Sequence, residues 1–243
     1  MLKEFILHPA TVEVNNQCLN IIAKFKNLSL SSHWLASWQQ RIEDEWSSIG
    51  LMLQTKRLMQ VMLEGEGALV LLPLFLAQKS SLNKHFIFSN NVVFSASDWE
   101  QIAGFYRQSG FEGQCFDAIF ADLIEQWPLA LPGVHRIDFA DGCGSLTLGL
   151  GDPEYMQQQW LCSIDLFVRD EPSELSEQRS WPWVLRYAAA QSYFLMGHAH
   201  LVREDFLFAA KKAGLQLTGP QAVRSHLQKP EVPKAKTMAI IGG

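Results

Sequence analysis

Acidic residues, amides and glycines follow several short apolar segments of this 243-residue chain. These runs are Glu64 to Gly67, Asn90-Asn91, Gly151-Asp152 and Arg169 to Glu171. A carboxylate or amide just after a strand can accept hydrogen bonds from a ribose hydroxyl or an amino group, and a glycine lets a ligand approach the backbone. Turns and helix caps use the same residue types. A ligand site and plain turn chemistry are therefore both open readings of these positions.

The segments around these runs alternate between strand and helix patterns. Expected strands, each a short apolar run bounded by glycine, proline, serine or asparagine, cover 21–26, 57–63, 85–89, 134–139, 145–150, 163–168 and 192–197. Expected helices cover 33–49, 69–78, 96–108, 114–127, 153–160, 181–190 and 202–213, with Ser97-Asp98 capping the third. This alternation predicts an α/β fold whose mostly parallel sheet carries helices on both faces. Ligands of such sheets bind where strands end, beside the switch point in strand order.

Composition restricts the class of protein. Apolar residues make up 48% of the chain, enough for a sizeable core. The longest apolar run, Ala68 to Ala77, is about half of what a bilayer span requires, and the start of the chain lacks a secretory signal pattern. We therefore expect a cytoplasmic protein with no membrane segment. The four cysteines stand far apart and His198 and His200 have no evident third ligand, so no metal site is predicted.

Three segments resemble one family of enzymes. Gln126 to Asp152 reads QWPLALPGVHRIDFADGCGSLTLGLGD, Ile164 to Glu174 reads IDLFVRDEPSE, and Lys236 to Gly243 reads KTMAIIGG. The first two are similar to the N-terminal methyltransferase domain of the bifunctional tRNA 5-methylaminomethyl-2-thiouridine biosynthesis protein family. The third looks like the first strand of that family's FAD domain, cut off inside its glycine-rich loop. The resemblance is specific over about forty residues and loose over the rest of the chain.

The resemblance implies a Rossmann-like, S-adenosylmethionine-dependent methyltransferase fold joined to an FAD-dependent oxidase. The oxidase of that family removes a carboxymethyl group from the wobble uridine of tRNA, and the methyltransferase then methylates the freed amine. By the same resemblance Asp152 would bind the adenosyl group of the donor, and Asp170 would line the cleft that receives the amine. Asp152 would equally suit the N-cap of a helix that begins at Pro153, and Asp170 would equally suit a solvated turn.

The resemblance also divides the chain. Residues 1–226 would form the methyltransferase-like domain, and residues 227–236, with Pro230 and Pro233, would form a linker. Residues 237–243 would be the first strand and the truncated glycine loop of the FAD-binding domain. We therefore expect tRNA and a C-terminal FAD oxidase domain of the same chain as partners. A complete one-domain protein with an apolar tail is the alternative.

Several binding positions depart from the family pattern. The glycine-rich loop for the donor corresponds here to Glu64, Gly65, Glu66 and Gly67, with fewer glycines and an added acid. The acid expected to bind the donor ribose is replaced by Asn90, a neutral and weaker acceptor. Two functions follow: an active methyltransferase on 5-aminomethyl-2-thiouridine, or a catalytically silent domain that positions tRNA or stabilises the adjoining oxidase. The retained Asp152 and Asp170 favour the first, and the altered loop favours the second.

Overall fold

The computed structural model describes residues 18–21, 28–52, 56–79, 82–90, 94–129, 131–139, 144–152, 163–169, 187–196, 216–218 and 224–228. Several expectations fall outside these ranges. They include the helices expected over 153–160 and 202–213, the predicted acid Asp170, the pair His198 and His200, and the expected linker and FAD segments from 229 onward.

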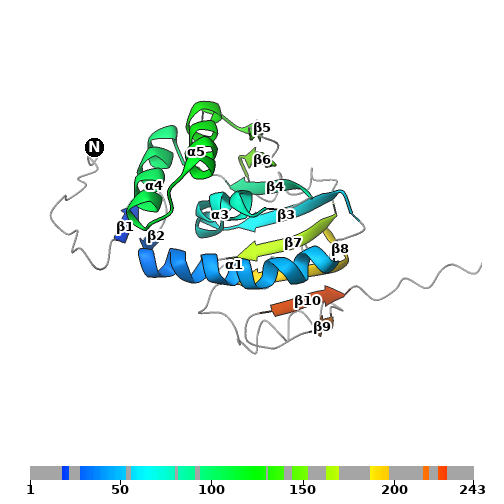
Figure 1. Cartoon of the computed structure of the whole chain (residues 1–243). Helices are drawn as coiled ribbons and strands as arrows, with labels where there is room; N and C mark the ends of the chain where they lie inside the picture. The colour runs from blue at the N-terminus through cyan, green and yellow to red at the C-terminus, as the bar shows by residue number, and fades with distance from the viewer. Residues whose placement is uncertain are drawn as a thin grey trace, which may run out of the picture.

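An eight-stranded sheet is the centre of the fold (Figure 1), with the strand order β5-β6-β4-β3-β7-β8-β10-β9. Its strands are β3 (Leu58–Glu64), β4 (Asn83–Asn90), β5 (Gly133–Asp138), β6 (Ser145–Leu150), β7 (Ile164–Arg169), β8 (Ala188–Met196), β9 (Gln216–Thr218) and β10 (Arg224–Gln228). The strands β6, β4, β3, β7 and β8 run parallel, whereas β5 and β10 are antiparallel to their neighbours. A separate hairpin pairs β1 (Cys18–Ile21) with β2 (Leu28–Ser31).

The strand order identifies the fold class. From β3 the chain moves outward to β4 and β6, then returns to the other side of β3 for β7 and β8. This doubly wound order reverses between β3 and β7, which is the switch point. The antiparallel β10 lies between β8 and β9. The arrangement is a doubly wound, Rossmann-like sheet that is mostly parallel, as the sequence predicted.

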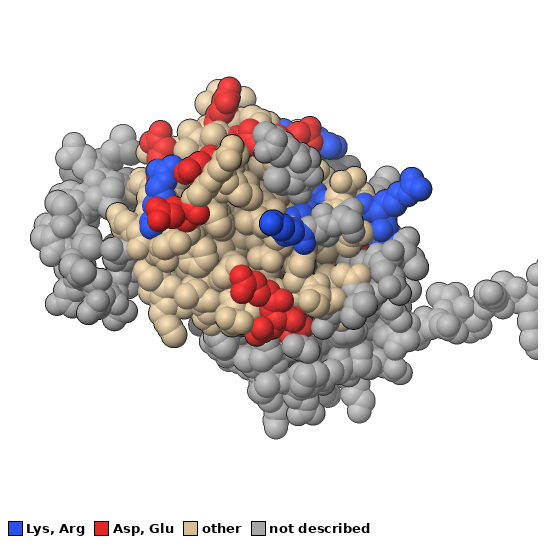
Figure 2. All heavy atoms as spheres, in the orientation of Figure 1, with Lys and Arg blue, Asp and Glu red and all other residues tan. Residues whose placement is uncertain are grey.

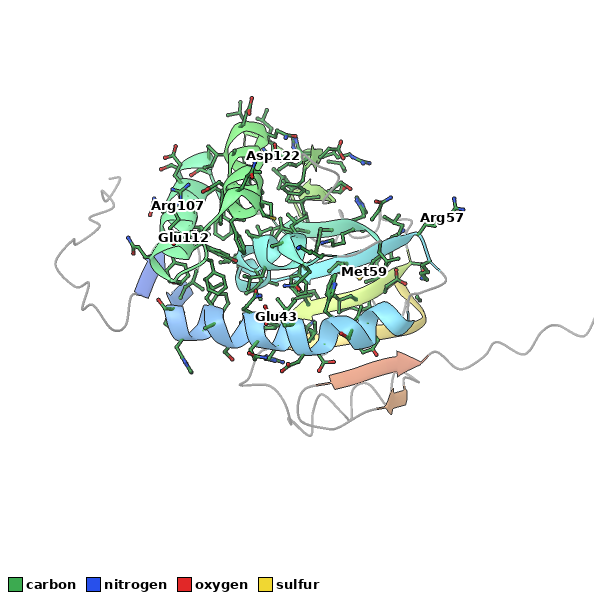
Figure 3. All side chains as sticks on the ribbon, in the orientation of Figure 1. Glu43, Arg57, Met59, Arg107, Glu112 and Asp122 are labelled. Carbon is green, nitrogen blue, oxygen red and sulfur yellow. The ribbon has the colours of Figure 1, made fainter. Side chains whose placement is uncertain are left out.

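Five helices are described, and they contact one another in one layer. They are α1 (Ser32–Met52), α2 (Glu66–Val70), α3 (Leu72–Ala77), α4 (Ala96–Gln108) and α5 (Gln114–Gln126). Figure 3 shows α1 running alongside the sheet, with Met59 of β3 labelled near it and Arg57 at the end of the sheet where β3 begins. The helices and one face of the sheet share a single apolar core, which includes Val61, Phe86, Leu148 and Val168.

The two faces of the sheet differ because side chains alternate along each strand. The face toward the helix layer contributes apolar side chains to the core. The opposite face carries Gln60, His85, Ser145 and Thr147, and at the carboxyl ends of two central strands it carries Glu64 and Arg169. The helices expected to cover this second face fall outside the described residues, except for the end of one.

The sequence predicted most elements, with three corrections. Residues 188–190, expected to end a helix, begin β8. Of the strand expected over 21–26 only Ile21 is described, as the last residue of β1, and residues 22–26 lie outside the described ranges. The cap of α4 is Ser95, and Ser97 is not the cap: the hydroxyl oxygen of Ser95 accepts from the Asp98 backbone N–H at 3.2 Å, and the backbone N–H of Ser95 donates to the Asp98 carboxylate at 2.6 Å. The helix expected over 69–78 is split at Leu71, which places Pro73 in the first turn of α3, where proline is tolerated.

The strands β9 and β10 were not predicted, and β10 ends two residues beyond the domain boundary expected at 226. The boundary itself stays a prediction. Among the described helices, none combines the length and the apolar character needed to cross a membrane.

Candidate functional site

The predicted ligand positions lie at the edge of the sheet where the parallel strands end. Glu64 is the last residue of β3, Asn90 of β4 and Arg169 of β7, while Asp152 follows the end of β6 by two residues. Adjacent strands lie about 4.8 Å apart, so the ends of β3 and β6, with β4 between them, are about 10 Å apart. That spacing matches the length of a nucleoside, and the position is beside the switch point.

The turn after β3 exposes backbone to this edge. Gly65 has φ 88°, a left-handed conformation that favours glycine, and a Cβ added there would meet no heavy atom within 4 Å. Its carbonyl accepts from the Leu69 backbone N–H at 3.2 Å, which starts the short helix α2. Gly67 is buried within α2, and Glu66 is half-buried in its first turn. The turn therefore keeps open space beside Gly65, as a ligand-binding turn requires.

Glu64 and Arg169 form an ion pair across the switch point. The guanidinium donates to the same carboxylate oxygen twice, from Nε to Oε2 at 2.7 Å and from Nη2 to Oε2 at 2.5 Å. The two residues are direct partners in the register of β3 and β7. The side chain of Arg169 is only 6% exposed and that of Glu64 is 21% exposed. The acid that the sequence assigned to the donor is thus already paired with a cation of the protein.

The pairing of Arg169 was not predicted from the sequence. Arg169 was expected to follow the strand over 163–168, in the run from Arg169 to Glu171. In the structure it is the last residue of β7, and it is buried. The signal that was available is an arginine at the end of a strand otherwise made of buried apolar residues and Asp165.

Asn90 and Asp152 belong to neighbouring strands. Asn90 pairs in register with Leu150, two residues before Asp152. Asp152 is exposed, and it follows Gly151, whose φ of 139° favours glycine. The side chain of Asn90 lies outside the described set. The structure therefore brings Glu64, Gly65, Gly67, Asn90 and Asp152 to one edge of the sheet, while Asp170, one residue after Arg169, lies outside the described residues.

Two further polar groups on the second face are satisfied within the protein. Asp165, 1% exposed, forms an ion pair with Lys56 and accepts from the Gln60 backbone N–H at 3.0 Å. His85 on β4 is linked to Ser145 on β6, with Nδ1 and Oγ 2.8 Å apart. Burial, and secondarily the charge of Arg136, lowers the pKa of His85, while Asp138 opposes the shift. Among the described residues, no group of three or more His, Cys, Asp or Glu side chains is placed to hold a metal ion.

Comparisons with curated proteins return one protein name for part of the chain, whereas no family model matches it. Similar proteins named "tRNA 5-methylaminomethyl-2-thiouridine biosynthesis bifunctional protein MnmC" come from Cupriavidus metallidurans, 44% identical over 59 residues, and from Burkholderia vietnamiensis, 29% identical over 133 residues. The matches cover 24% and 49% of this chain but only 9% and 20% of those proteins.

Two solved structures are similar at a low level. One is a methyltransferase from Geobacter sulfurreducens, with TM-score 0.39 and 12% identity, covering 81% of this chain and 88% of the other. The other is the putative methyltransferase yhhF from Escherichia coli, with TM-score 0.37 and 11% identity, covering 88% of this chain and 100% of the other. The curated relatives confirm the resemblance drawn from the sequence: parts of this chain are similar to parts of the tRNA 5-methylaminomethyl-2-thiouridine biosynthesis bifunctional proteins, and the matched stretches span a fifth or less of the length of those proteins.

Proposed function

We propose that this chain is a methyltransferase-like domain that acts in tRNA wobble-uridine modification. The curated relatives are named for the biosynthesis of 5-methylaminomethyl-2-thiouridine in tRNA, and the sheet has the order of a Rossmann-like methyltransferase. The full function we assign is S-adenosylmethionine-dependent methylation of 5-aminomethyl-2-thiouridine, as part of a bifunctional protein with an FAD oxidase domain. Its place of work would be the cytoplasm, where tRNA is modified.

The proposed ligand is the nucleoside end of S-adenosylmethionine, at the edge formed by β3, β4 and β6. One observation carries the proposal: Asn90 ends β4, and Gly65 and Asp152 follow the ends of β3 and β6, at the edge of the sheet beside the switch point, where ligands of this fold class bind. The amide of Asn90 and the carboxylate of Asp152 are the group types that accept from ribose hydroxyls and an adenine amino group. The open space beside Gly65 allows the ligand to approach the backbone.

The amino-acid end of the same donor fits less well. Its ammonium group needs an anionic or carbonyl partner, and the Glu64 carboxylate in this position is paired with Arg169. Glu66 adds a second carboxylate where the carboxylate of the donor would lie, and like charges in a partly desolvated site repel. The described residues therefore fit the nucleoside end of the donor and not its amino-acid end, and no transfer step is drawn through the donor.

We assign Asp170 to the tRNA side of the reaction. An amine must be neutral to act as a nucleophile, so a carboxylate beside it can orient the amine and accept its proton. In the sequence Asp170 directly follows Arg169, the last residue of β7, and β7 ends at the same edge of the sheet as β6. This role rests on the resemblance and on the position in the chain.

The tRNA surface we propose is not the face that carries α1. Phosphate backbones are bound by gathered lysine and arginine side chains. On the face seen in Figure 2 acidic and basic groups are interspersed among the described residues. Arg107 and Asp117, for example, form an exposed pair between α4 and α5 at 3.1 Å, which cancels their charges locally.

A silent domain is the second candidate, and the Glu64–Arg169 pair favours it. A domain that no longer holds the amino-acid end of its donor could still position tRNA or stabilise the oxidase domain. The test is transfer of a labelled methyl group from S-adenosylmethionine to tRNA from cells that lack the modification. Transfer by the 243-residue chain that is lost in Asp170→Asn supports the active methyltransferase. No transfer by a sample that binds the donor supports the silent domain.

A further inference from the structure

We infer that the Glu64–Arg169 pair makes this site recognise the nucleoside part of its ligand without recognising the amino-acid part. The inference rests on the proposed function, because it concerns the same edge of the sheet. Nucleoside thioethers that lack the amino-acid chain should therefore bind to this site about as tightly as those that carry it.

The geometry keeps the carboxylate of Glu64 engaged. Both guanidinium nitrogens of Arg169 that contact it, Nε and Nη2, point at the single oxygen Oε2. The pair is set by the backbone, since Glu64 and Arg169 are opposite each other in the β3–β7 ladder.

The energetics follow from burial. Arg169 is nearly inaccessible, and breaking a buried ion pair by removing one of its partners is strongly unfavourable. A ligand ammonium that bound the Glu64 carboxylate in place of Arg169 would break this buried contact. A ligand ammonium that approached the intact pair would meet a neutral unit, whose field falls off faster than that of a lone carboxylate. In both cases the ligand ammonium gains no favourable contact with the Glu64 carboxylate.

Glu66 acts in the same direction on the other charge of the ligand. Its carboxylate is in the first turn of α2, directly after Gly65. A ligand carboxylate bound at this turn would lie close to the first turn of α2, which carries a second acidic residue, and like charges repel. Neither the ammonium nor the carboxylate of an amino-acid group therefore gains a favourable contact from Glu64 or Glu66. The positions proposed for the nucleoside, Asn90 and Asp152, are on other strands.

The experiment compares two ligands that differ only in the amino-acid chain. S-adenosylhomocysteine and 5′-methylthioadenosine are both neutral thioethers of the same nucleoside, and each is titrated calorimetrically into the whole chain at pH 7.5. We expect dissociation constants within about threefold of each other. S-adenosylhomocysteine binding more than tenfold tighter would overturn the inference and leave the proposed function standing. Binding of neither ligand to a folded sample would overturn both.

Variants test the role of the pair directly. Arg169→Met frees the Glu64 carboxylate, and we expect S-adenosylhomocysteine to gain about tenfold over 5′-methylthioadenosine, the scale of one charge-assisted hydrogen bond. The double variant Glu64→Gln/Arg169→Met should lose that gain. Lys56→Met is the matched control. It breaks the ion pair between Lys56, just before β3, and Asp165 of β7, at the opposite end of these strands from the site, and should leave the ratio unchanged.

One single variant keeps the test decisive if Arg169→Met fails to fold. Glu64→Gln should leave the ratio of the two affinities unchanged, because Glu64 makes no contact with the ligand in our account. If Glu64→Gln instead weakens S-adenosylhomocysteine tenfold and spares 5′-methylthioadenosine, Glu64 binds the amino-acid chain and the inference is wrong.

Discussion

Lys56 and Asp165 form an ion pair beside the first residues of β3 and β7, at the opposite end of these strands from Glu64 and Arg169. The central strands are therefore joined by charge at both ends, and only one end lies at the candidate site. Asp165 also accepts from the Gln60 backbone N–H at 3.0 Å, and it is 1% exposed. This end of the pair of strands has a structural role.

Asp165→Ala should therefore lower the free energy of unfolding. The buried Gln60 backbone N–H loses its acceptor, which costs about 2 kcal/mol. Urea unfolding followed by circular dichroism measures the change. Asp117→Ala is the control, because the Arg107–Asp117 pair is more than half exposed on both sides and should change stability by about 0.5 kcal/mol or less. Equal effects of the two substitutions would contradict the structural role of Asp165.

Gly65→Ala should weaken ligand binding more than it weakens the fold. An alanine at φ 88° is strained by about 1 kcal/mol, and its methyl group fills the open space that we assign to the ligand. Stability is measured in urea and S-adenosylmethionine binding by calorimetry. Gly104→Ala is the matched control in the interior of α4, where the φ angle is ordinary and alanine should stabilise the helix by about 0.5 to 1 kcal/mol. Unchanged binding in Gly65→Ala would place the ligand elsewhere.

His85 should make the protein less stable as the pH falls below 6.5. Burial lowers the pKa of His85 in the folded state, with Arg136 adding to the shift and Asp138 opposing it. The unfolded chain then binds the proton first, so the stability present above pH 6.5 is lost as the pH falls. Urea unfolding at pH 7.5 and pH 5.0 should show a smaller decline in His85→Asn than in the parent, and His33→Asn, on the exposed side of α1, should decline as the parent does. Equal declines in all three would contradict this account of His85.

Tyr106→Phe should destabilise the contact between α4 and α2. The hydroxyl of Tyr106 donates to the Val70 carbonyl at 2.6 Å in the core, a bond that contributes about 1 kcal/mol. Burial raises the pKa of Tyr106 well above 10.0, so the stability it contributes is present below pH 10 and is lost as the pH rises further. The difference between Tyr106→Phe and the parent should therefore shrink between pH 8 and pH 10.5. A constant difference over that range would show that Tyr106 does not ionise on unfolding.

Local patterns predicted the elements that local chemistry determines. The strand 145–150 and the helix 96–108 were predicted with their observed bounds, because alternation defines the one and a polar cap with an amphipathic pattern defines the other. The predicted ends of β3, β4 and β6 were also within one residue of the observed ends, so the candidate ligand positions were correctly expected at one edge of the sheet. Each of these signals is contained within about a dozen residues of sequence.

Features that depend on distant partners were missed. Arg169 and Glu64 are 105 positions apart, and only the register of β3 against β7 makes them neighbours. The strand β10 has a polar sequence, and it is a strand because it pairs along β8. Ser97 was predicted to cap α4 together with Asp98, whereas Ser95 is the cap, because its hydroxyl and backbone N–H form the reciprocal bonds with Asp98.

The most direct test of the proposed site is calorimetric titration of the 243-residue chain with S-adenosylmethionine, beside Asp152→Ala. Because Asp152 is exposed at the end of β6, its removal should leave the fold intact, which circular dichroism checks. The account predicts saturable binding by the parent and at least a tenfold loss in Asp152→Ala, the scale of a hydrogen bond to a charged group. No binding by a folded parent, or equal binding by the two proteins, would contradict a methyl-donor site at this edge of the sheet.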